Sequence, residues 1–443
     1  MVQSRERFRP VNGPAPSGDL LLVIRRHHLS TAALAATLAL AGPALAQQSP
    51  EAVAAAALRS APVFDGHNDV PEQLRDRYRN VIGSFDFNDT TDVPESYGST
   101  RMHTDLPRLR QGQVGAQFWS VYVSANLPPD EAAVTTLEQI DVMKRLIDRY
   151  PDHLEFVTTA DEVEAAMRRG HIASLLGMEG GSSIAGSLAV LRQMHALGAR
   201  YMTLTHSRTI PWADSATDVP QHDGLTDFGV QVVQEMARLG MLIDLSHVSE
   251  ATMHDAMNAT GAPVIFSHSG ARAVNGHARN VPDSVLERLP QEGGLVMVVG
   301  LPDYLSEDLR QHGALRAAER ARLETLWRGQ PQAVAEALAA WDVANPAPQA
   351  TVATMADHID HIRNVAGIDH IGIGGDYDGM ATGPVGMEDT AGYPALFVEL
   401  ARRGYTRQDL AKIANGNILR VMREAEAYAA TQHGLAPIET PVD

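Results

Sequence analysis

Residues 64–71, Phe-Asp-Gly-His-Asn-Asp-Val-Pro, place a histidine and an aspartate two positions apart directly after a short apolar run. Side chains two residues apart on an extended strand point to the same face. His67 and Asp69 would therefore direct an imidazole and a carboxylate to one point, which suits a divalent metal of the zinc type. The pair alone is a weak signal, because the same spacing also occurs in solvated turns after strands. A metal site here requires further ligands from other parts of the chain.

Groups that can bind a metal or titrate also follow other apolar runs of strand length. These groups are Glu179, His206, His247, His268, Asp376 and Asp378. A single histidine after a strand is more often structural than functional. With His67, four histidines each follow such a run. Together with a glutamate and aspartates, they are hard to assign to chance. The pattern predicts one shared site built from several strand ends.

The elements that must position these groups alternate regularly along the chain. Expected strands lie at residues 63–65, 116–123, 173–178, 201–204, 242–245, 264–266, 295–299 and 371–373. Segments with helical periodicity lie between them, among others at 131–150, 160–169, 188–196, 228–238 and 250–259. Eight strands alternating with helices favour an α/β fold, a (β/α)8 TIM-type barrel, over an open doubly wound sheet. No Gly-x-Gly-x-x-Gly follows a strand into a helix, so a dinucleotide-binding fold has no support.

One segment interrupts this alternation. Residues 305–338, between the seventh and eighth strands, are charged and helical in pattern. The segment is too short for a core of its own, so we expect a helical insertion at the barrel mouth. With the loop at 86–97 it is expected to form the pocket walls. Near the C-terminus, residues 406–430 predict helices with a break at 415–417.

The composition argues against several classes of function. A formal net charge of −18 disfavours a nucleic-acid or anionic-membrane partner. The chain has no cysteine, which excludes disulfides, thiolate nucleophiles and cysteine-based zinc sites. Its only lysines, Lys144 and Lys412, lie in segments with helical patterns.

The N-terminal residues have the three parts of a secretory signal. An arginine pair at 25–26 precedes an apolar stretch at 29–40, and Ala-Leu-Ala follows at 44–46. The stretch is shorter than the roughly 20 residues that a transmembrane helix needs. We expect residues 1–46 to be a cleaved signal peptide and residues 47–443 to form a single barrel domain, exported to the periplasm or secreted. The arginine pair partly fits a twin-arginine signal. No apolar tail follows Leu435, so we expect no C-terminal lipid anchor.

Two helical histidines call for a different interpretation. His358 and His361 are three residues apart, with no carboxylate at a nearby strand end. This spacing predicts a solvated helix face rather than a third metal site.

The motifs, taken in order, closely resemble the membrane (renal) dipeptidase family of the amidohydrolase superfamily, from about residue 61 to 424. They are Asp-Gly-His-Asn-Asp at 65–69, Met-Glu-Gly-Gly at 178–181, Leu-Thr-His at 204–206, Pro-Trp-Ala-Asp at 211–214, Ser-His-Val at 246–248, Ser-His-Ser at 267–269, Arg-Asn-Val-Pro-Asp at 279–283 and Gly-Gly-Asp-Tyr-Asp-Gly at 374–379. Together these motifs are highly specific, and none departs from the family pattern at a functional position.

The resemblance implies two zinc ions per chain. His67 and Asp69 would hold one ion, and His247 and His268 the other. Glu179 would bridge the two ions, and a hydroxide shared between them would attack the peptide bond of a free dipeptide. The ions carry more charge than the two carboxylates and the hydroxide together. The remaining positive charge can polarise the peptide carbonyl and stabilise the developing oxyanion.

The same resemblance assigns three residues to the substrate. His206 would hydrogen-bond the oxyanion, and Arg279 would bind the dipeptide's carboxylate through its planar fork. Asp376 would take the proton of the attacking hydroxide and pass it to the leaving amine. Their structural alternatives are a core histidine, a surface-loop arginine and a turn cap. A site that binds the carboxylate need not read the neighbouring side chain closely, so the resemblance implies that a C-terminal D-residue is accepted. It also allows a homodimer.

Two other functions stay open at this point. Another amidohydrolase-superfamily enzyme would act on a small amide or lactone, and many of these bridge their metals with a carboxylated lysine. Neither Lys144 nor Lys412 lies at a strand end, so Glu179 must form the bridge, as in the dipeptidases. A non-enzymatic zinc-binding protein would explain the five metal ligands but not the three substrate-facing residues.

Overall fold

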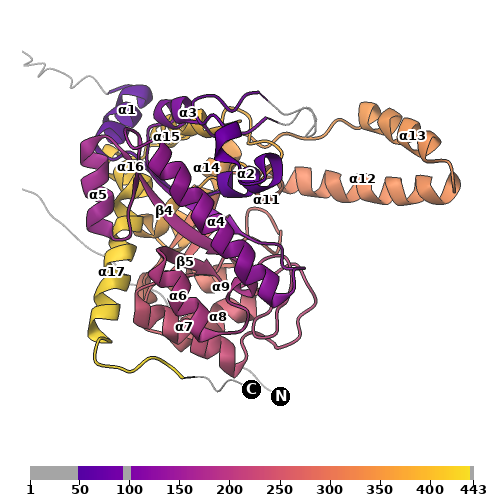
Figure 1. Ribbon diagram of the computed structural model, residues 1–443. Coiled ribbons are helices and arrows are strands. Elements are labelled where there is room, and N and C mark those ends of the chain that lie inside the picture. The colour runs from indigo at the N-terminus through magenta and orange to yellow at the C-terminus, as the bar shows by residue number, and fades with distance from the viewer. Residues whose placement is uncertain (1–47, 93–100, 440–443) are drawn as a thin grey trace, which may run out of the picture. The chain divides into compact units, whose positions relative to one another are not determined.

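The computed structural model describes residues 48–92 and 101–439 (Figure 1). The predicted signal peptide, residues 1–46, lies outside these ranges. No helix in the described part of the chain is long and apolar enough to cross a membrane.

Eight parallel strands close into a barrel, as predicted. In chain order they are β1 (Val63–Asn68), β2 (Val114–Tyr122), β4 (Ile172–Glu179), β5 (Ala199–Thr203), β6 (Leu242–Asp244), β7 (Val264–Ser269), β8 (Leu295–Val299) and β9 (Ile371–Gly374). Around the ring they follow the order β2-β1-β9-β8-β7-β6-β5-β4, and pairing of β2 with β4 closes it. All carboxyl ends therefore lie on one face, where the predicted site residues are.

A ninth strand was not predicted. The three residues of β3 (Leu154–Phe156) pair with the start of β4, where Leu154 lies opposite Ile172. Three residues are too few to produce a recognisable alternation, and only the first of them is buried. This strand lies outside the barrel ring and does not alter its order.

The helices between the strands agree closely with the sequence pattern. α5 (Ala160–Arg169), α6 (Leu188–Ala196) and α8 (Glu250–Ala259) have the predicted bounds, and α4 (Pro129–Arg149) and α7 (Asp227–Leu239) differ by one or two residues. Capping residues at the helix ends explain why the sequence pattern predicts the helix bounds so closely. A capping box between Thr159 and Glu162 starts α5, and Gly170 ends it at a φ of +82°. The other α-helices of the barrel domain are α1 (Pro50–Ser60), α2 (Val70–Tyr78), α3 (Leu106–Gln111), α9 (Asp283–Leu286), α10 (Leu289–Glu292), α11 (Pro302–Leu305), α14 (Val352–Val365), α15 (Tyr393–Arg402), α16 (Arg407–Ala411) and α17 (Asn417–Thr431).

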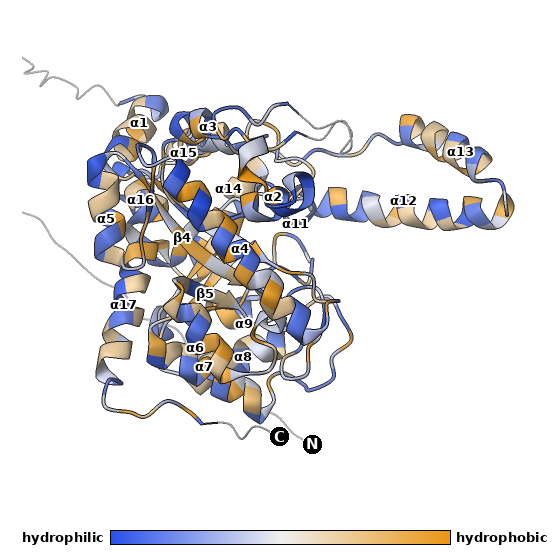
Figure 2. Ribbon diagram, in the orientation of Figure 1, coloured by the Kyte–Doolittle hydropathy of each residue, from blue (hydrophilic) through white to orange (hydrophobic). Residues whose placement is uncertain are grey.

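The predicted insertion forms two helices, α12 (Glu307–Leu326) and α13 (Pro331–Ala344), between the seventh and eighth barrel strands. Figure 1 shows them extending together from α11 away from the barrel. Figure 2 shows polar and apolar residues mixed along α12, and Leu323 is its only buried residue. Such a pair of helices has little core of its own, as expected for an insertion.

The predicted break at 415–417 is a π-helical turn, Lys412–Gly416, which joins α16 to α17 without interrupting the helix. Two asparagines in this segment, Asn415 and Asn417, form hydrogen bonds near the starts of β1 and β9. The Asn415 side chain donates to the carbonyl of Pro62, and that of Asn417 donates to the carbonyls of Ile368 and Ile371. A π-turn shifts the phase of a helix, so it can direct both side chains toward β1 and β9.

Aromatic side chains fill the barrel below the site. Phe64 and Phe118 stack with ring centroids 5.4 Å apart, and Phe118 lies 4.8 Å from the ring of Tyr201. Gly177 makes room for this layer, because a Cβ there would come within 2.0 Å of the Tyr201 ring. The hydroxyl of Tyr201 reaches up to Nδ1 of His67 at 2.8 Å. The packed interior thus supports a site residue directly.

The prediction of a solvated face for His358 was wrong. Its side chain is fully buried, with Nδ1 accepting from the Ala271 amide and Nε2 donating to the Leu305 carbonyl. His361 is partly exposed and lies 2.8 Å from Asp283. The i, i+3 spacing could not distinguish the two, because burial depends on the loops that cover α14.

His358 is expected to make stability depend on pH. Burial lowers its pKa from 6.5 to about 4, although the Leu305 carbonyl opposes this shift. Below pH 6.5 the unfolded chain therefore binds more protons at this group than the folded chain. Stability should fall as the pH drops from 6.5 toward 4, and His358→Gln should reduce this slope by up to about 1.4 kcal/mol per pH unit. Thermal unfolding of both proteins across this range measures the difference, and identical slopes would contradict the assignment.

Candidate active site

The carboxyl ends of the barrel strands surround a cavity of about 340 Å3. Those that supply the predicted metal ligands are β1, β4, β6 and β7, and β5 supplies His206. The cavity is lined by Asp69, Glu72, Tyr122, Glu179, His206, Ser207, Thr217, His247, His268, Arg279, Leu301, Tyr304, Asp376 and Gly379. Seven of the eight predicted site residues line it, and His67 lies directly below, bonded to Tyr201.

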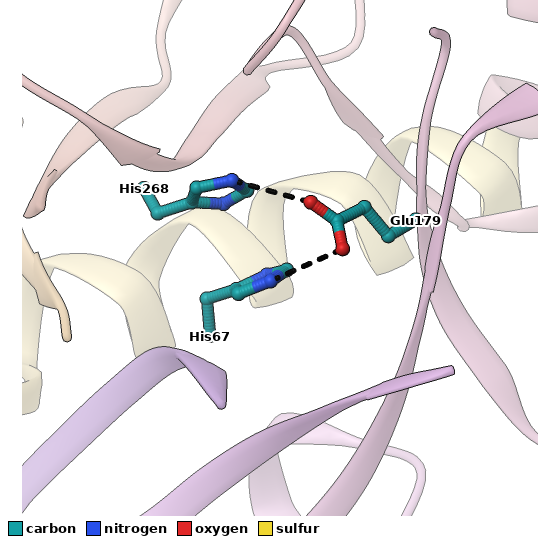
Figure 3. A group of neighbouring side chains, drawn as sticks. All are labelled: His67, Glu179 and His268. Carbon is teal, nitrogen blue, oxygen red and sulfur yellow. Dashed lines mark ion pairs between the residues drawn. The ribbon is translucent and has the colours of Figure 1, made fainter. Parts of the chain in front are cut away.

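Glu179 lies at the centre of this cluster. One carboxylate oxygen, Oε1, is 3.0 Å from Nε2 of His247 and 3.4 Å from Nε2 of His268. The other, Oε2, is 3.5 Å from Nε2 of His67, and Figure 3 shows the rings of His67 and His268 directed at the two different oxygens. The Ser120 hydroxyl donates to Oε2 at 3.1 Å and fixes the carboxylate. One carboxylate therefore faces two separate imidazole groups, one through each oxygen.

Asp69 and Asp376 extend the cluster on the β1 side. Oδ2 of Asp69 is 3.4 Å from Nε2 of His67. Three groups of side chains each bring one ligand atom per residue to within 4.8 Å of the others. The groups are His67, Asp69 and Asp376; His67, Glu179 and His268; and Glu179, His206 and His247. Gly379 permits this approach, because a Cβ there would come within 2.2 Å of Asp69 Oδ2.

Hydrogen bonds at Nδ1 orient the imidazoles of His67 and His268. Nδ1 of His67 is hydrogen-bonded to the Tyr201 hydroxyl and Nδ1 of His268 to the Ser267 hydroxyl, each at 2.8 Å. Asp244 in turn accepts from that serine at 2.6 Å. Bonds at Nδ1 direct both Nε2 atoms into the cluster, the usual arrangement around metal-binding histidines.

These donors fit a zinc-type metal. Nε2 of His67 is buried without a hydrogen-bond partner among the described residues, although it faces two carboxylates. Nε2 of His247 and Nε2 of His268 lie only 2.9 Å apart. Imidazole nitrogens and carboxylate oxygens grouped in this way match the ligand preference of Zn²⁺.

The electrostatics favour the protonation states that metal ligands require at three of the ligands, Glu179, His247 and His268. At His67 burial would lower the pKa, but Tyr201, Asp69 and Glu179 raise it well above 6.5. Burial would raise the pKa of Glu179, but His67, His206 and the other imidazoles hold it well below 4.5. Burial lowers the pKa values of His247 and His268 well below 6.5, and Arg279 or His67 adds to the shift. The carboxylate is therefore charged and these two imidazoles are neutral.

Asp376 has a different environment. It lies just after β9, its amide donates to the His67 carbonyl at 3.1 Å, and its side chain is almost fully buried. Burial raises its pKa, His67 opposes this, and Asp69 and Glu179 add to it, with a result of about 8. Its φ is +62° and that of His247 is +68°, conformations that non-glycine residues rarely adopt. Such strain is typical of functional sites.

Arg279 and His206 face the same cavity. Arg279 is 1% exposed, which excludes the surface-loop alternative. Its guanidinium donates to the Ser269 hydroxyl and the His268 carbonyl and lies 5.3 Å from the Tyr304 ring centre, while its Nε has no partner among the described residues. Burial lowers the pKa of His206 despite Glu179, so its imidazole is neutral and can donate one hydrogen bond.

Sequence reasoning missed several residues around the site. Glu72, Tyr122 and Tyr304 line the cavity, and Tyr201 lies below it. Glu72 carried a signal, since it lies in the turn of helix that follows Asp69. No described residue of 86–92 or 305–338 lines this cavity, so the predicted pocket walls are wrong for these two segments. The rest of the predicted loop, residues 93–97, lies outside the described residues. The insertion begins just after Tyr304 and extends away from the barrel.

Tyr201→Phe is expected to weaken zinc binding about 10-fold or more, because the variant loses the hydrogen bond that orients His67. Competition with a chromophoric chelator measures the affinity. Tyr405→Phe is a matched control, since that hydroxyl binds Asp360 instead. Equal affinities in wild type and Tyr201→Phe would show that the hydroxyl does not orient the ligand.

A closed parallel barrel with a carboxylate and imidazole cluster at its strand ends defines the class of protein: a metal-dependent TIM-barrel enzyme. Residues 51–435 match the family described as Membrane dipeptidase (Peptidase family M19). The chain belongs to this family of metallo-dipeptidases, as its motifs predicted.

Similar proteins agree with this assignment. The chain is 41% identical to Dipeptidase 3 of Rattus norvegicus and 40% identical to Dipeptidase 3 of Mus musculus, each over 391 residues. The matches cover 87% of this chain and 70% and 69% of those relatives.

Solved structures show the same fold. The probable dipeptidase PvdM from Pseudomonas aeruginosa has a TM-score of 0.71 at 23% identity and covers 86% of this chain and 99% of its own. The metallopeptidase dipeptidase AC, also of family M19, has a TM-score of 0.66 at 25% identity and covers 82% and 98%. A metallopeptidase from Rhodobacter sphaeroides, liganded with a phosphinate mimic of the dipeptide L-Ala-D-Ala, has a TM-score of 0.66 at 24% identity and covers 82% and 99%.

Proposed function

We propose that this protein is a binuclear zinc dipeptidase that hydrolyses free dipeptides, including those with a C-terminal D-residue. The observation that carries the proposal is the position of Glu179, with one oxygen toward His67 and the other toward His247 and His268. His67 and Asp69 would hold one zinc ion, His247 and His268 the other, and Glu179 would bridge them. The Rhodobacter neighbour, liganded with a mimic of L-Ala-D-Ala, supports the choice of substrate.

The zinc ions would act as Lewis acids and lower the pKa of the attacking water. The chain's own residues would do the rest. Arg279 binds the substrate carboxylate through its buried fork, and His206 donates a hydrogen bond to the carbonyl oxygen as negative charge develops there. Asp376 accepts the proton of the water and transfers it to the nitrogen of the leaving amine.

Arg279 also favours a dipeptidase over a lactonase. A buried guanidinium is retained at a site when an anion compensates it. A dipeptide supplies a carboxylate near the scissile bond, whereas a neutral lactone or small amide does not. Metal binding does not need the positive charge of Arg279, so this charge favours a substrate that carries a carboxylate.

A turnover screen tests the proposal. The zinc-loaded protein is incubated with a panel of L-L and L-D dipeptides, with and without a chelator. We expect hydrolysis of several members and loss of the activity with the chelator. No hydrolysis of any dipeptide would overturn the proposed function.

Arg279→Ala should raise KM for free dipeptides about 10- to 100-fold, because a charge-assisted bidentate contact is lost. C-terminally amidated dipeptides should be affected little, since they carry no carboxylate. Initial-rate kinetics on both substrate forms measure the effect. Arg145→Ala is the control, since that exposed arginine pairs with Asp141 on the same helix, α4. Equal effects on both forms would contradict carboxylate binding.

Export and assembly are part of the proposal. We propose that residues 1–46 direct export to the periplasm or the outside and are then removed, on the basis of the arginine pair, the apolar stretch and the Ala-Leu-Ala site. N-terminal sequencing of the exported protein should give a start at residue 47. A homodimer is the assembly that the family resemblance allows, and light scattering of the purified protein tests it.

A further inference from the structure

Glu72 is a carboxylate in the cavity that the proposed reaction does not use. It lies in the first turn of α2 and lines the cavity with Asp69, Tyr122 and Asp376. No described residue forms a hydrogen bond or an ion pair with its half-buried side chain. It also belongs to none of the groups of described residues that could hold a metal.

The surroundings of Glu72 are acidic. Burial raises its pKa, and Asp69, Glu179, Asp76 and Asp376 raise it further, to about 9. Zinc ions at the cluster would neutralise Asp69 and Glu179, which bind them, but would leave Glu72 without a direct partner. A carboxylate in this position is stabilised by a cation that enters the cavity.

Arg279 lines the same cavity from a different part of the barrel. Glu72 follows β1, whereas Arg279 follows β7 and contacts Ser269 and His268 on that strand. β9 and β8 separate these two strands in the eight-stranded ring. The cavity therefore has the Glu72 carboxyl group on the β1 side and the Arg279 guanidinium on the β7 side. In the other direction around the ring, β4, β5 and β6 lie between these strands and position Glu179, His206 and His247.

A free dipeptide has the complementary charges. Its α-ammonium group lies next to the scissile carbonyl on one side, and its carboxylate lies beyond the scissile bond on the other. We propose that Glu72 binds the α-ammonium group and so selects substrates with an unblocked N-terminus. This inference rests on the dipeptidase function proposed above. It makes Glu72 a specificity residue and assigns it no part in the proton transfers.

A pair of matched substrates tests the proposal. L-Ala-L-Ala carries the ammonium group, and propionyl-L-alanine has the same chain with hydrogen in its place. We expect wild type to prefer the dipeptide by about 10- to 100-fold in kcat/KM, the range for a hydrogen bond to a charged group. Glu72→Gln should lower kcat/KM for L-Ala-L-Ala by most of this factor and leave propionyl-L-alanine nearly unchanged. Glu72→Asp should retain part of the preference.

Competition against L-Ala-L-Ala gives the affinity of propionyl-L-alanine if its turnover is slow. Asp76→Asn is the matched control, because Asp76 is an exposed acid one turn further along the same helix. It should retain the wild-type preference. Zinc content by elemental analysis should equal that of wild type in every variant.

Two results would overturn the proposal. One is a preference for the dipeptide that Glu72→Gln leaves intact. The other is an equal loss by Glu72→Gln on both substrates, which would place Glu72 in the catalytic or metal-binding machinery. Failure of the dipeptidase function would look different, since wild type itself would then hydrolyse no dipeptide.

Discussion

Asp376→Asn is expected to lower kcat about 1000-fold while the protein retains both zinc ions. The magnitude is typical of a general acid–base group, and an amide cannot accept the proton of the attacking water. Asp376 has the required position, because it lines the cavity beside Asp69 and is nearly fully buried. Burial raises its pKa to about 8, close to neutral pH, where a carboxyl group can both give up and accept a proton.

The measurement is kcat on a good dipeptide together with zinc content. Asp378→Asn serves as the control, because Asp378 is a buried aspartate two residues away that accepts from the His103 amide. It does not line the cavity, and asparagine can still accept that bond. Full activity of Asp376→Asn on dipeptides would show that another group transfers the proton.

Glu179→Gln is expected to abolish the metal site and the activity together. The amide cannot present an anionic oxygen to each side of the cluster, so both groups of ligands lose a donor at once. We expect zinc content to fall well below two ions per chain. Since the metal supplies several kcal/mol of transition-state stabilisation, kcat/KM should fall at least about 1000-fold.

Elemental analysis and thermal unfolding with and without zinc test this second expectation. Zinc should raise the unfolding temperature of wild type and not that of the variant, because a ligand stabilises only the state that binds it. Glu155→Gln is the control, since that glutamate pairs with Arg169 and His171 away from the cavity. Two zinc ions retained in Glu179→Gln would mean that the bridge is not needed for binding.

The reading as a non-enzymatic zinc-binding protein is disfavoured by what surrounds the cluster. Arg279 and Asp376 are both buried at the cavity although neither is needed to hold the ions. Burying such groups costs free energy unless a partner compensates them, and a bound substrate would supply that partner. Membership of the metallo-dipeptidase family agrees with a catalytic site.

The sequence by itself determined the barrel and the metal cluster. Alternation of apolar runs with helical periods is a local property, and so are the caps that start and end a helix such as α5. Parallel strands in a closed ring must direct their carboxyl ends to one face, so His67, Glu179 and His268 could be brought together from their places after strands. The family motifs then indicated which roles to expect for these residues.

The tertiary structure alone decided the environment of these residues. Whether Arg279 was a surface or a cavity residue depended on β7 and Tyr304 packing around it. His358 and His361 have the same local pattern, yet loops from other parts of the chain bury one and leave the other partly exposed. Tyr201 supports His67 only because Gly177, on the neighbouring strand, leaves space for its ring. These are long-range contacts, and residue spacing along the chain carries no information about them.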